Sequence, residues 1–185
     1  KLGIVLCLIV AFFIGLVAAA SWQDVLKFLA ATPFGQTDPL FGRDIAFYVF
    51  SLPVYSLGLG LIRILIILSL IVSGAIYVLR GSLNLAALLR KFDLPIKLMK
   101  HSSHDQKARL HIGILLFLFL ATVAAGTYLS LYNLLTTQSG LVFGVAFTDA
   151  NVMIPILKVS IFAYGLAAIL ALYYGVSGKI SPLLG

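Results

Sequence analysis

Four long apolar runs divide this chain, and they restrict it to folds in which helices are surrounded by lipid. The runs cover residues 2–23, 54–79, 110–131 and 154–176, and a helix needs about 20 apolar residues to cross a bilayer. The 185 residues are 62% hydrophobic and only 10% charged, whereas a soluble domain is about 25% charged. The sequence therefore predicts an all-α membrane protein with four transmembrane helices in a single module.

The basic residues indicate how these helices are oriented. Seven of the 13 Lys and Arg residues fall between Arg80 and Arg109, in the loop between the second and third runs. Loops rich in Lys and Arg stay on the cytoplasmic side of a membrane. Both chain ends are therefore predicted to be cytoplasmic, and loops 21–53 and 132–155 to be outside. Because the positive charge clusters beside apolar spans, we expect no nucleic-acid partner.

The basic loop also contains an amphipathic pattern. Four apolar residues recur at helical spacing within residues 83–92, which predicts a short cytoplasmic helix lying in the membrane interface. Packing of this segment under the bundle, or on a partner protein, is the alternative. The basic residues expected to bind lipid headgroups, at about 1 kcal/mol each, are Arg90, Lys91, Lys97 and Lys100.

The outer loop at residues 32–55 is too apolar and aromatic for a connection in water. Asp38 before Pro39 is a helix-start pattern, and Asp44 is expected to cap a helix over residues 45–52. Eight residues cannot span a bilayer as a helix. This partly helical loop is therefore expected to lie in the interface or to form a re-entrant element.

Arg63 is the basic residue embedded in an apolar run, about two helical turns from its predicted outer end. A charge inside the membrane is costly and often functional. An ion pair with an outer Asp, or extension of the side chain to the interface, is the structural explanation; a transport or ligand role is the alternative. The candidate polar and ion-pair residues are Arg63, Asp38, Arg43, Asp44 and Asp149.

Recognisable catalytic chemistry is missing from the sequence. The Asp residues are far apart and match no metal-binding loop, and His101 and His104 lack further ligands nearby. His111, one turn into the third run, is expected to form a hydrogen bond near the interface. The sequence predicts no enzymatic activity, no metal and no cofactor, and leaves bound lipid or pigment open.

Two segments carry a more specific pattern. Residues 38–55 read DP-x-FGRD-x-x-FY-x-F-x-LP-x-Y, and a second segment runs from Leu134-Leu135 through Phe143-Gly144 and Thr148-Asp149 to Pro155. Together they resemble the UPF0182 family of uncharacterised prokaryotic membrane proteins. The resemblance implies a multi-pass protein of the prokaryotic cell membrane, or of an internal membrane such as the thylakoid. Since family members are commonly much longer, it also implies a fragment.

Small residues at helical spacing favour close packing between membrane helices. They are Ala11, Gly15 and Ala19; Ser69 and Ser73; Ala121 and Ala125; and Ala163, Ala167 and Ala171. The sequence therefore favours a non-enzymatic scaffold or subunit that stabilises a larger membrane assembly, with lipids and other membrane proteins as partners. Part of a transporter or channel is the alternative, and a membrane enzyme acting at the outer face is the third. The two outer segments are expected to pack together as a cap over the bundle.

Overall fold

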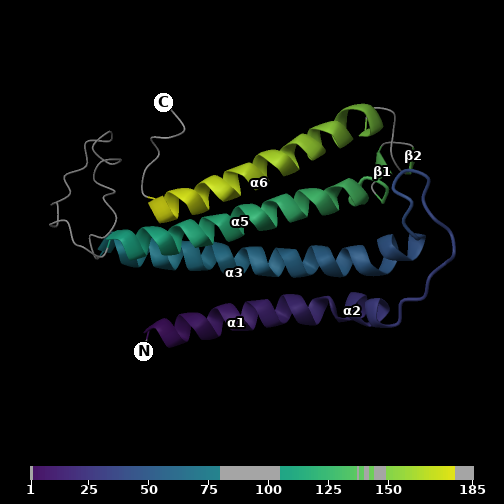
Figure 1. Cartoon of the computed structure of the whole chain (residues 1–185). Helices are drawn as coiled ribbons and strands as arrows, with labels where there is room; N and C mark the ends of the chain where they lie inside the picture. The colour runs from purple at the N-terminus through teal and green to yellow at the C-terminus, as the bar shows by residue number, and fades with distance from the viewer. Residues whose placement is uncertain (1, 80–104, 137, 140–141, 144–148, 178–185) are drawn as a thin grey trace, which may run out of the picture. The chain divides into compact units, whose positions relative to one another are not determined.

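The computed structural model describes residues 2–79, 105–136, 138–139, 142–143 and 149–177 (Figure 1). Its elements are α1 (Leu2–Ala20), α2 (Trp22–Leu29), the π-helical turn η1 (Phe47–Ser51), α3 (Leu52–Leu79), α5 (Asp105–Asn133), β1 (Gln138–Ser139), β2 (Val142–Phe143), the π-helical turn η3 (Asp149–Met153) and α6 (Ile154–Ser177). The two short strands pair antiparallel. The fold is thus helical, as predicted. The predicted interfacial helix at residues 83–92 lies outside the described residues.

Three helical segments are long and apolar enough to cross a membrane: Phe47–Leu79, Gln106–Asn133 and Ala150–Ser177. They correspond to the second, third and fourth predicted spans. The first predicted span is not one continuous helix, because Val10–Ala20 and Trp22–Leu29 meet at a bend of 54°. A fourth crossing exists only if this bent pair counts as one span, so the prediction of four spans is not confirmed.

The bend between α1 and α2 lies at Ser21. The Ser21 hydroxyl donates a hydrogen bond to the Val17 carbonyl oxygen at 3.2 Å, and such side-chain bonding to the preceding turn tends to bend helices. Helix α2 then carries an exposed ion pair between Asp24 and Lys27 at 3.6 Å. Charged side chains resist transfer into hydrocarbon. The bend falls inside the predicted span 2–23, close to its end.

Helix α3 begins earlier than predicted. The segment 45–52, expected to be a separate interfacial or re-entrant element, instead leads directly into α3 through η1. The reason is Pro53, which has no N–H to donate to the preceding turn. A wider turn accommodates it, and the Leu52 N–H donates to the Phe47 carbonyl oxygen five residues back. The turn η3 precedes Pro155 in the same way, so proline here marks the second residue of a helix and not its start.

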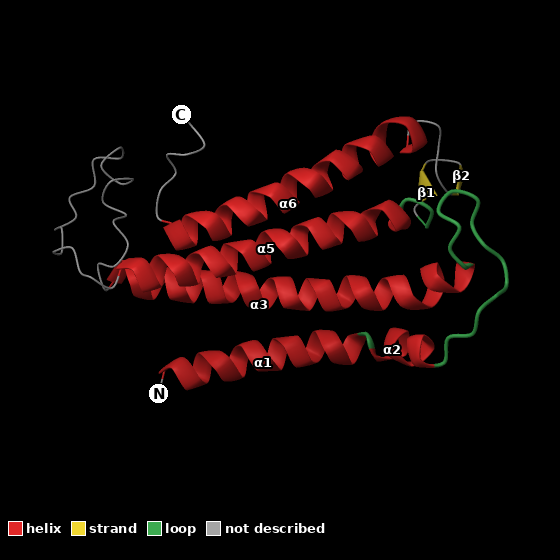
Figure 2. Ribbon diagram, viewed as in Figure 1, coloured by secondary structure: helices red, strands yellow, loops and turns green. Residues whose placement is uncertain are grey.

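The chain divides into two compact units. Unit 1 contains Lys1–Leu61 and Tyr128–Leu157, and unit 2 contains Ile62–Thr127 and Lys158–Gly185. Unit 1 contains α1, α2 and the long connection to α3, drawn as loop in Figure 2. Each unit has its own packing.

Within unit 2, α5 lies between α3 and α6 (Figure 1). Two helices approach closely at Gly113 of α5 and Gly175 of α6. A Cβ atom built on Gly113 would lie 2.7 Å from the Gly175 Cα and 3.1 Å from the Ala171 carbonyl oxygen. These helix backbones are therefore in direct contact. Ala171 belongs to a predicted small-residue series, but the two glycines that permit the contact do not.

We expect Gly113→Ala to weaken the contact between α5 and α6, because the added methyl group would meet backbone and not a movable side chain. Overpacking of this kind costs about 1–3 kcal/mol. The free energy of unfolding in detergent micelles, followed by circular dichroism, measures the effect.

Gly165→Ala on α6 is the matched control, because a Cβ there meets nothing within 4 Å. This control should be neutral or stabilising by up to about 1 kcal/mol. Equal stability of the two variants would contradict the proposed contact.

Candidate functional site

Two carboxylates organise the aromatic loop, residues 31–51, in unit 1. Asp44 Oδ1 accepts hydrogen bonds from the backbone N–H groups of Ala46 at 2.8 Å and Phe34 at 3.1 Å, and Oδ2 accepts from Gly35 at 3.0 Å. Gly35 has a φ of 71°, in the left-handed region that glycine adopts without strain. Asp44 thus caps the helical start at residue 45, as predicted, and also fixes the beginning of the loop.

Asp38 has a denser set of donors. Its Oδ1 accepts from the N–H groups of Leu40 at 2.8 Å and Phe41 at 2.7 Å, and its Oδ2 from the Arg43 N–H at 3.0 Å and the Tyr48 hydroxyl at 2.6 Å. These bonds close a single turn, and the helix-start pattern at this position does not lead into a helix. Because hydrogen bonds to an ionised acceptor are stronger than neutral ones, this carboxylate replaces the regular secondary structure that the loop lacks.

Both carboxyl groups are held in their ionised form. Burial raises the pKa of Asp38, but the hydrogen bond from Tyr48 and those from the loop backbone lower it. Together these hydrogen bonds outweigh burial, and the pKa is below its ordinary value. The Ala46 N–H lowers the pKa of Asp44, and with Phe34 and Gly35 it outweighs the effect of burial. A carboxylate with a lowered pKa and several donors is a poor general base near neutral pH. Asp38 and Asp44 thus serve the loop's structure.

An aromatic cluster joins the loop to the end of α5. Tyr48, Leu52 and Tyr132 are buried, at 7%, 1% and 7% exposure, and they form the core of the cluster. The rings of Phe41 and Phe47 lie 5.0 and 5.3 Å from that of Tyr132, within the range of favourable aromatic contacts. The aromatic loop is thus docked onto α5 and is not a free aqueous connection.

The cluster brings together parts of both motif segments. Leu135 of the second segment packs against the cluster of Tyr48, Leu52 and Tyr132, of which Tyr48 and Leu52 belong to the first segment. Both segments therefore contribute residues to this packing. Residues 144–148 lie outside the described part of the chain, and the side chain of Asp149, the first residue of η3, is also outside it. The wider cap over the helices remains a prediction.

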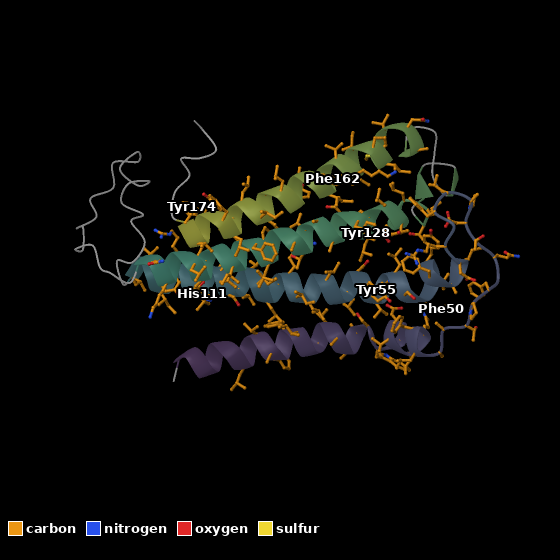
Figure 3. All side chains as sticks on the ribbon, in the orientation of Figure 1. Phe50, Tyr55, His111, Tyr128, Phe162 and Tyr174 are labelled. Atoms are coloured by element: carbon orange, nitrogen blue, oxygen red, sulfur yellow. The ribbon has the colours of Figure 1, made fainter. Side chains whose placement is uncertain are left out.

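Helix α2 contributes a further aromatic contact in unit 1. The ring of Phe28 lies 5.8 Å from that of Tyr55, and Tyr55 lies 6.3 Å from Phe47. Tyr55, Phe50 and Tyr128 are labelled in Figure 3. The aromatic side chains therefore connect α2, the loop and the first turns of α3 in one layer.

Arg43 places an exposed positive charge at the edge of this cluster. Its guanidinium carbon lies 5.5 Å from the centre of the Phe47 ring, a cation–π geometry. A hydrogen bond with the Tyr132 hydroxyl, and then one with Tyr128, raise the pKa of the guanidinium further. The Tyr128 and Tyr132 hydroxyls are themselves hydrogen-bonded at 2.7 Å. The sequence identified Arg43 but not these tyrosine partners, which come from α5.

Arg63 lies in unit 2, deeper in its helix than predicted. It is midway between Phe47 and Leu79, the ends of the longest apolar helical segment, and thus about 24 Å of helix from either end. Its Nη2 donates a hydrogen bond to the Thr122 carbonyl oxygen of α5 at 2.7 Å. The guanidinium also lies against Gly126, where an added Cβ would collide with Nη2. Arg63 therefore binds a helix backbone across the contact between α3 and α5.

Unit 2 also contains a hydrogen bond between the Tyr77 hydroxyl and His111 Nδ1 at 2.9 Å. His111 is labelled on α5 in Figure 3. The hydrogen bond predicted for His111 is therefore confirmed.

The predicted headgroup-binding residues Arg90, Lys91, Lys97 and Lys100 lie outside the described residues.

The sequence of this chain is similar to that of known proteins. The sequence model of UPF0182, an uncharacterised protein family, matches residues 1–184. This chain belongs to the UPF0182 family. The match covers both motif segments, so the resemblance inferred from them is confirmed. No solved structure matches the UPF0182 chain.

Several UPF0182 relatives cover most of this chain. The UPF0182 protein of Trichlorobacter lovleyi is 32% identical over 169 residues, which are 91% of this chain and 18% of that protein. The one of Methanospirillum hungatei is 34% identical over 177 residues, 91% of this chain and 20% of that protein. The one of Kocuria rhizophila is 31% identical over 179 residues, 96% and 17% respectively. This chain spans a fifth or less of the length of these relatives.

We expect Asp38→Ala to release the aromatic loop, because three backbone N–H groups and the Tyr48 hydroxyl lose their acceptor. After allowing for solvent screening, the loss is about 1–2 kcal/mol. Amide hydrogen exchange at Leu40 and Phe41 should accelerate about tenfold. Asp24→Ala, which removes only the exposed ion pair with Lys27, is the control and should leave these amides unchanged. Unchanged exchange in the Asp38→Ala variant would show that this carboxylate does not hold the loop.

The order of the loop should depend on pH with a definite sign. Because the folded-state pKa values of Asp38 and Asp44 are lowered, the carboxylates contribute their full stabilisation above the ordinary carboxyl pKa of about 4. That stabilisation is lost as the pH falls through the lower folded-state pKa values. Exchange protection, corrected for intrinsic rates, should be constant from about pH 7 to 5 and fall below about pH 4.

The Tyr48→Phe variant tests the cause of this behaviour. It removes the hydroxyl donor to Asp38 and thus raises the folded-state pKa of this carboxyl toward its ordinary value. The total loss of protection on acidification should therefore be smaller, and complete at a higher pH, than in the natural chain. Loss that already begins near neutral pH in the natural chain would show that groups other than these carboxylates control the loop.

Proposed function

We propose that this UPF0182 chain is a non-enzymatic membrane module that packs against further membrane helices and stabilises a larger assembly. Family membership and three apolar helices of spanning length support a membrane protein. The proposal that it is a structural module depends on where glycines lie in those helices.

Glycines at open helix positions carry this proposal. A Cβ atom at Gly58, Gly60 or Gly74 of α3 would meet nothing within 4 Å. Glycine in a helix is about 1 kcal/mol less favourable than alanine. A helix position that faces lipid has room for a larger side chain and does not require glycine. Where two helices of this chain approach closely, the contact is made by Gly113 and Gly175. The open glycines therefore favour contact with helices outside the described residues, since small residues permit close packing in membranes.

The relatives indicate one source for such helices. This chain matches 17–20% of the length of the three relatives described above. The remaining length of those proteins is sufficient to supply additional membrane segments. We place the basic loop at the cytoplasmic face of a prokaryotic membrane, following its Lys and Arg residues.

A transporter or channel component is the second candidate, and Arg63 is the observation that favours it. An ionisable residue at the middle of a span often marks a substrate or ion pathway. An enzyme acting through Asp38 and Asp44 is less favoured, because both carboxylates accept several hydrogen bonds from the loop.

The proposed function predicts that the protein extracted from its own membrane in a mild detergent contains helices packed on α3. Gly58→Leu and Gly74→Leu should each destabilise this assembly by about 1–3 kcal/mol, since bulk would separate the helices. Thermal dissociation followed by size-exclusion chromatography with light scattering measures the effect.

Val72→Leu is the matched control, because Val72 is exposed on α3 and its replacement adds bulk without removing a glycine. It should behave like the natural protein. A lone monomer whose stability is unaffected by all three changes would contradict the scaffold role.

A further inference from the structure

Arg63 carries a charge that the described part of unit 2 leaves without an acidic partner. The Thr122 carbonyl oxygen is a neutral acceptor, so it satisfies one N–H without neutralising the guanidinium. The Arg63 Nε is buried and has no hydrogen-bond partner among the described residues. A charge in this position is expensive unless it is paired.

The segments of spanning length contain no carboxylate. The chain has six acidic residues, all Asp, and none lies within the three segments of spanning length. Asp105 directly precedes the segment Gln106–Asn133, and 17 residues of helix, about 25 Å, separate it from Thr122. The described helices of spanning length therefore supply no carboxylate to Arg63, and a partner from elsewhere is needed to neutralise it.

Lipid phosphate is a poor partner at this depth. Arg63 is midway along its 33-residue segment, and we infer that it lies near the middle of the hydrocarbon, about 15 Å from either headgroup layer. The guanidinium is also tied to the Thr122 carbonyl oxygen of α5 at 2.7 Å, and this contact holds it near mid-span. A carboxylate carried by another membrane helix can lie at the same depth as the guanidinium, because it does not have to reach down from the headgroup layer.

We propose that Arg63, supported by Thr122 and Gly126, is a docking site for a membrane helix that carries an Asp or Glu at mid-depth. The planar guanidinium binds a carboxylate through two parallel hydrogen bonds. The absence of a side chain at Gly126 allows the guanidinium to lie on the α5 backbone, and the Arg63 side chain is only partly covered, so a partner has access. This inference rests on the proposed scaffold function and names the chemistry of its partner.

The test uses the full chain in phosphatidylcholine vesicles and three synthetic membrane helices as probes. Each probe is a leucine-rich peptide of about 20 residues whose central residue is Glu, Gln or Leu. Energy transfer between labels on chain and peptide measures association. We expect the Glu peptide to bind about tenfold more tightly than the other two, since polar pairs between membrane helices contribute about 1–2 kcal/mol.

Variants locate the preference. Arg63→Gln should abolish the preference for the Glu peptide, and Arg63→Lys should retain part of it because the charge remains. Arg109→Gln is the matched control: Arg109 is also partly buried with an unpartnered Nε, but it lies near the start of α5. This control should bind like the natural chain. Circular dichroism verifies that each variant keeps its helices.

Two outcomes would overturn the docking site. One is equal binding of the three peptides to the natural chain, which requires no variant to fold. The other is a preference that survives Arg63→Gln. If the peptides bind alike and Arg63→Gln instead abolishes chloride efflux from the vesicles, the residue serves an ion pathway. Equal peptide binding would leave the scaffold function intact if the glycine variants still disrupt the natural assembly.

Discussion

Polar groups in the spanning helices must find partners within protein, because the hydrocarbon of a bilayer offers none. Helices satisfy the backbone, and hydroxyl side chains bond to the preceding turn. Ser69 donates to the Leu65 carbonyl oxygen at 2.8 Å and Thr127 to that of Val123 at 2.9 Å. Arg63 cannot be satisfied in this local way, since its charge needs an opposite charge. Among the described residues, this constraint therefore also identifies Arg63 as a side chain whose hydrogen bonds are incomplete.

The aromatic loop solves the same problem by a different means. It has few regular backbone hydrogen bonds, and the carboxylates of Asp38 and Asp44 accept from six backbone N–H groups between them. The aromatic rings of Phe41 and Phe47 then pack the loop against Tyr132. Asp38 and Asp44, which the sequence identifies as candidate polar residues, thus hold the loop in the folded protein.

In both the aromatic loop and the spanning helices of the UPF0182 chain, charged groups bind to protein backbone. Its carboxylates are engaged in the aromatic loop, and glycines on α3 lie open at the helix surface. Its mid-span guanidinium contacts a backbone carbonyl of the adjacent helix. Such chemistry serves recognition between helices more directly than it serves catalysis. The family assignment and the three apolar helices of spanning length fit a membrane protein.

The sequence alone determined the features that depend on local pattern. Apolar length located three helices long enough to span a membrane, the position of Asp44 directly before residues 45–52 predicted a cap, and two motifs identified the family. Only the tertiary structure decided which distant residues meet, such as Gly113 with Gly175 and Arg63 with the α5 backbone. Hydropathy and capping act over a few residues of one chain segment. Contacts between helices depend on rotation and register, which no single segment encodes.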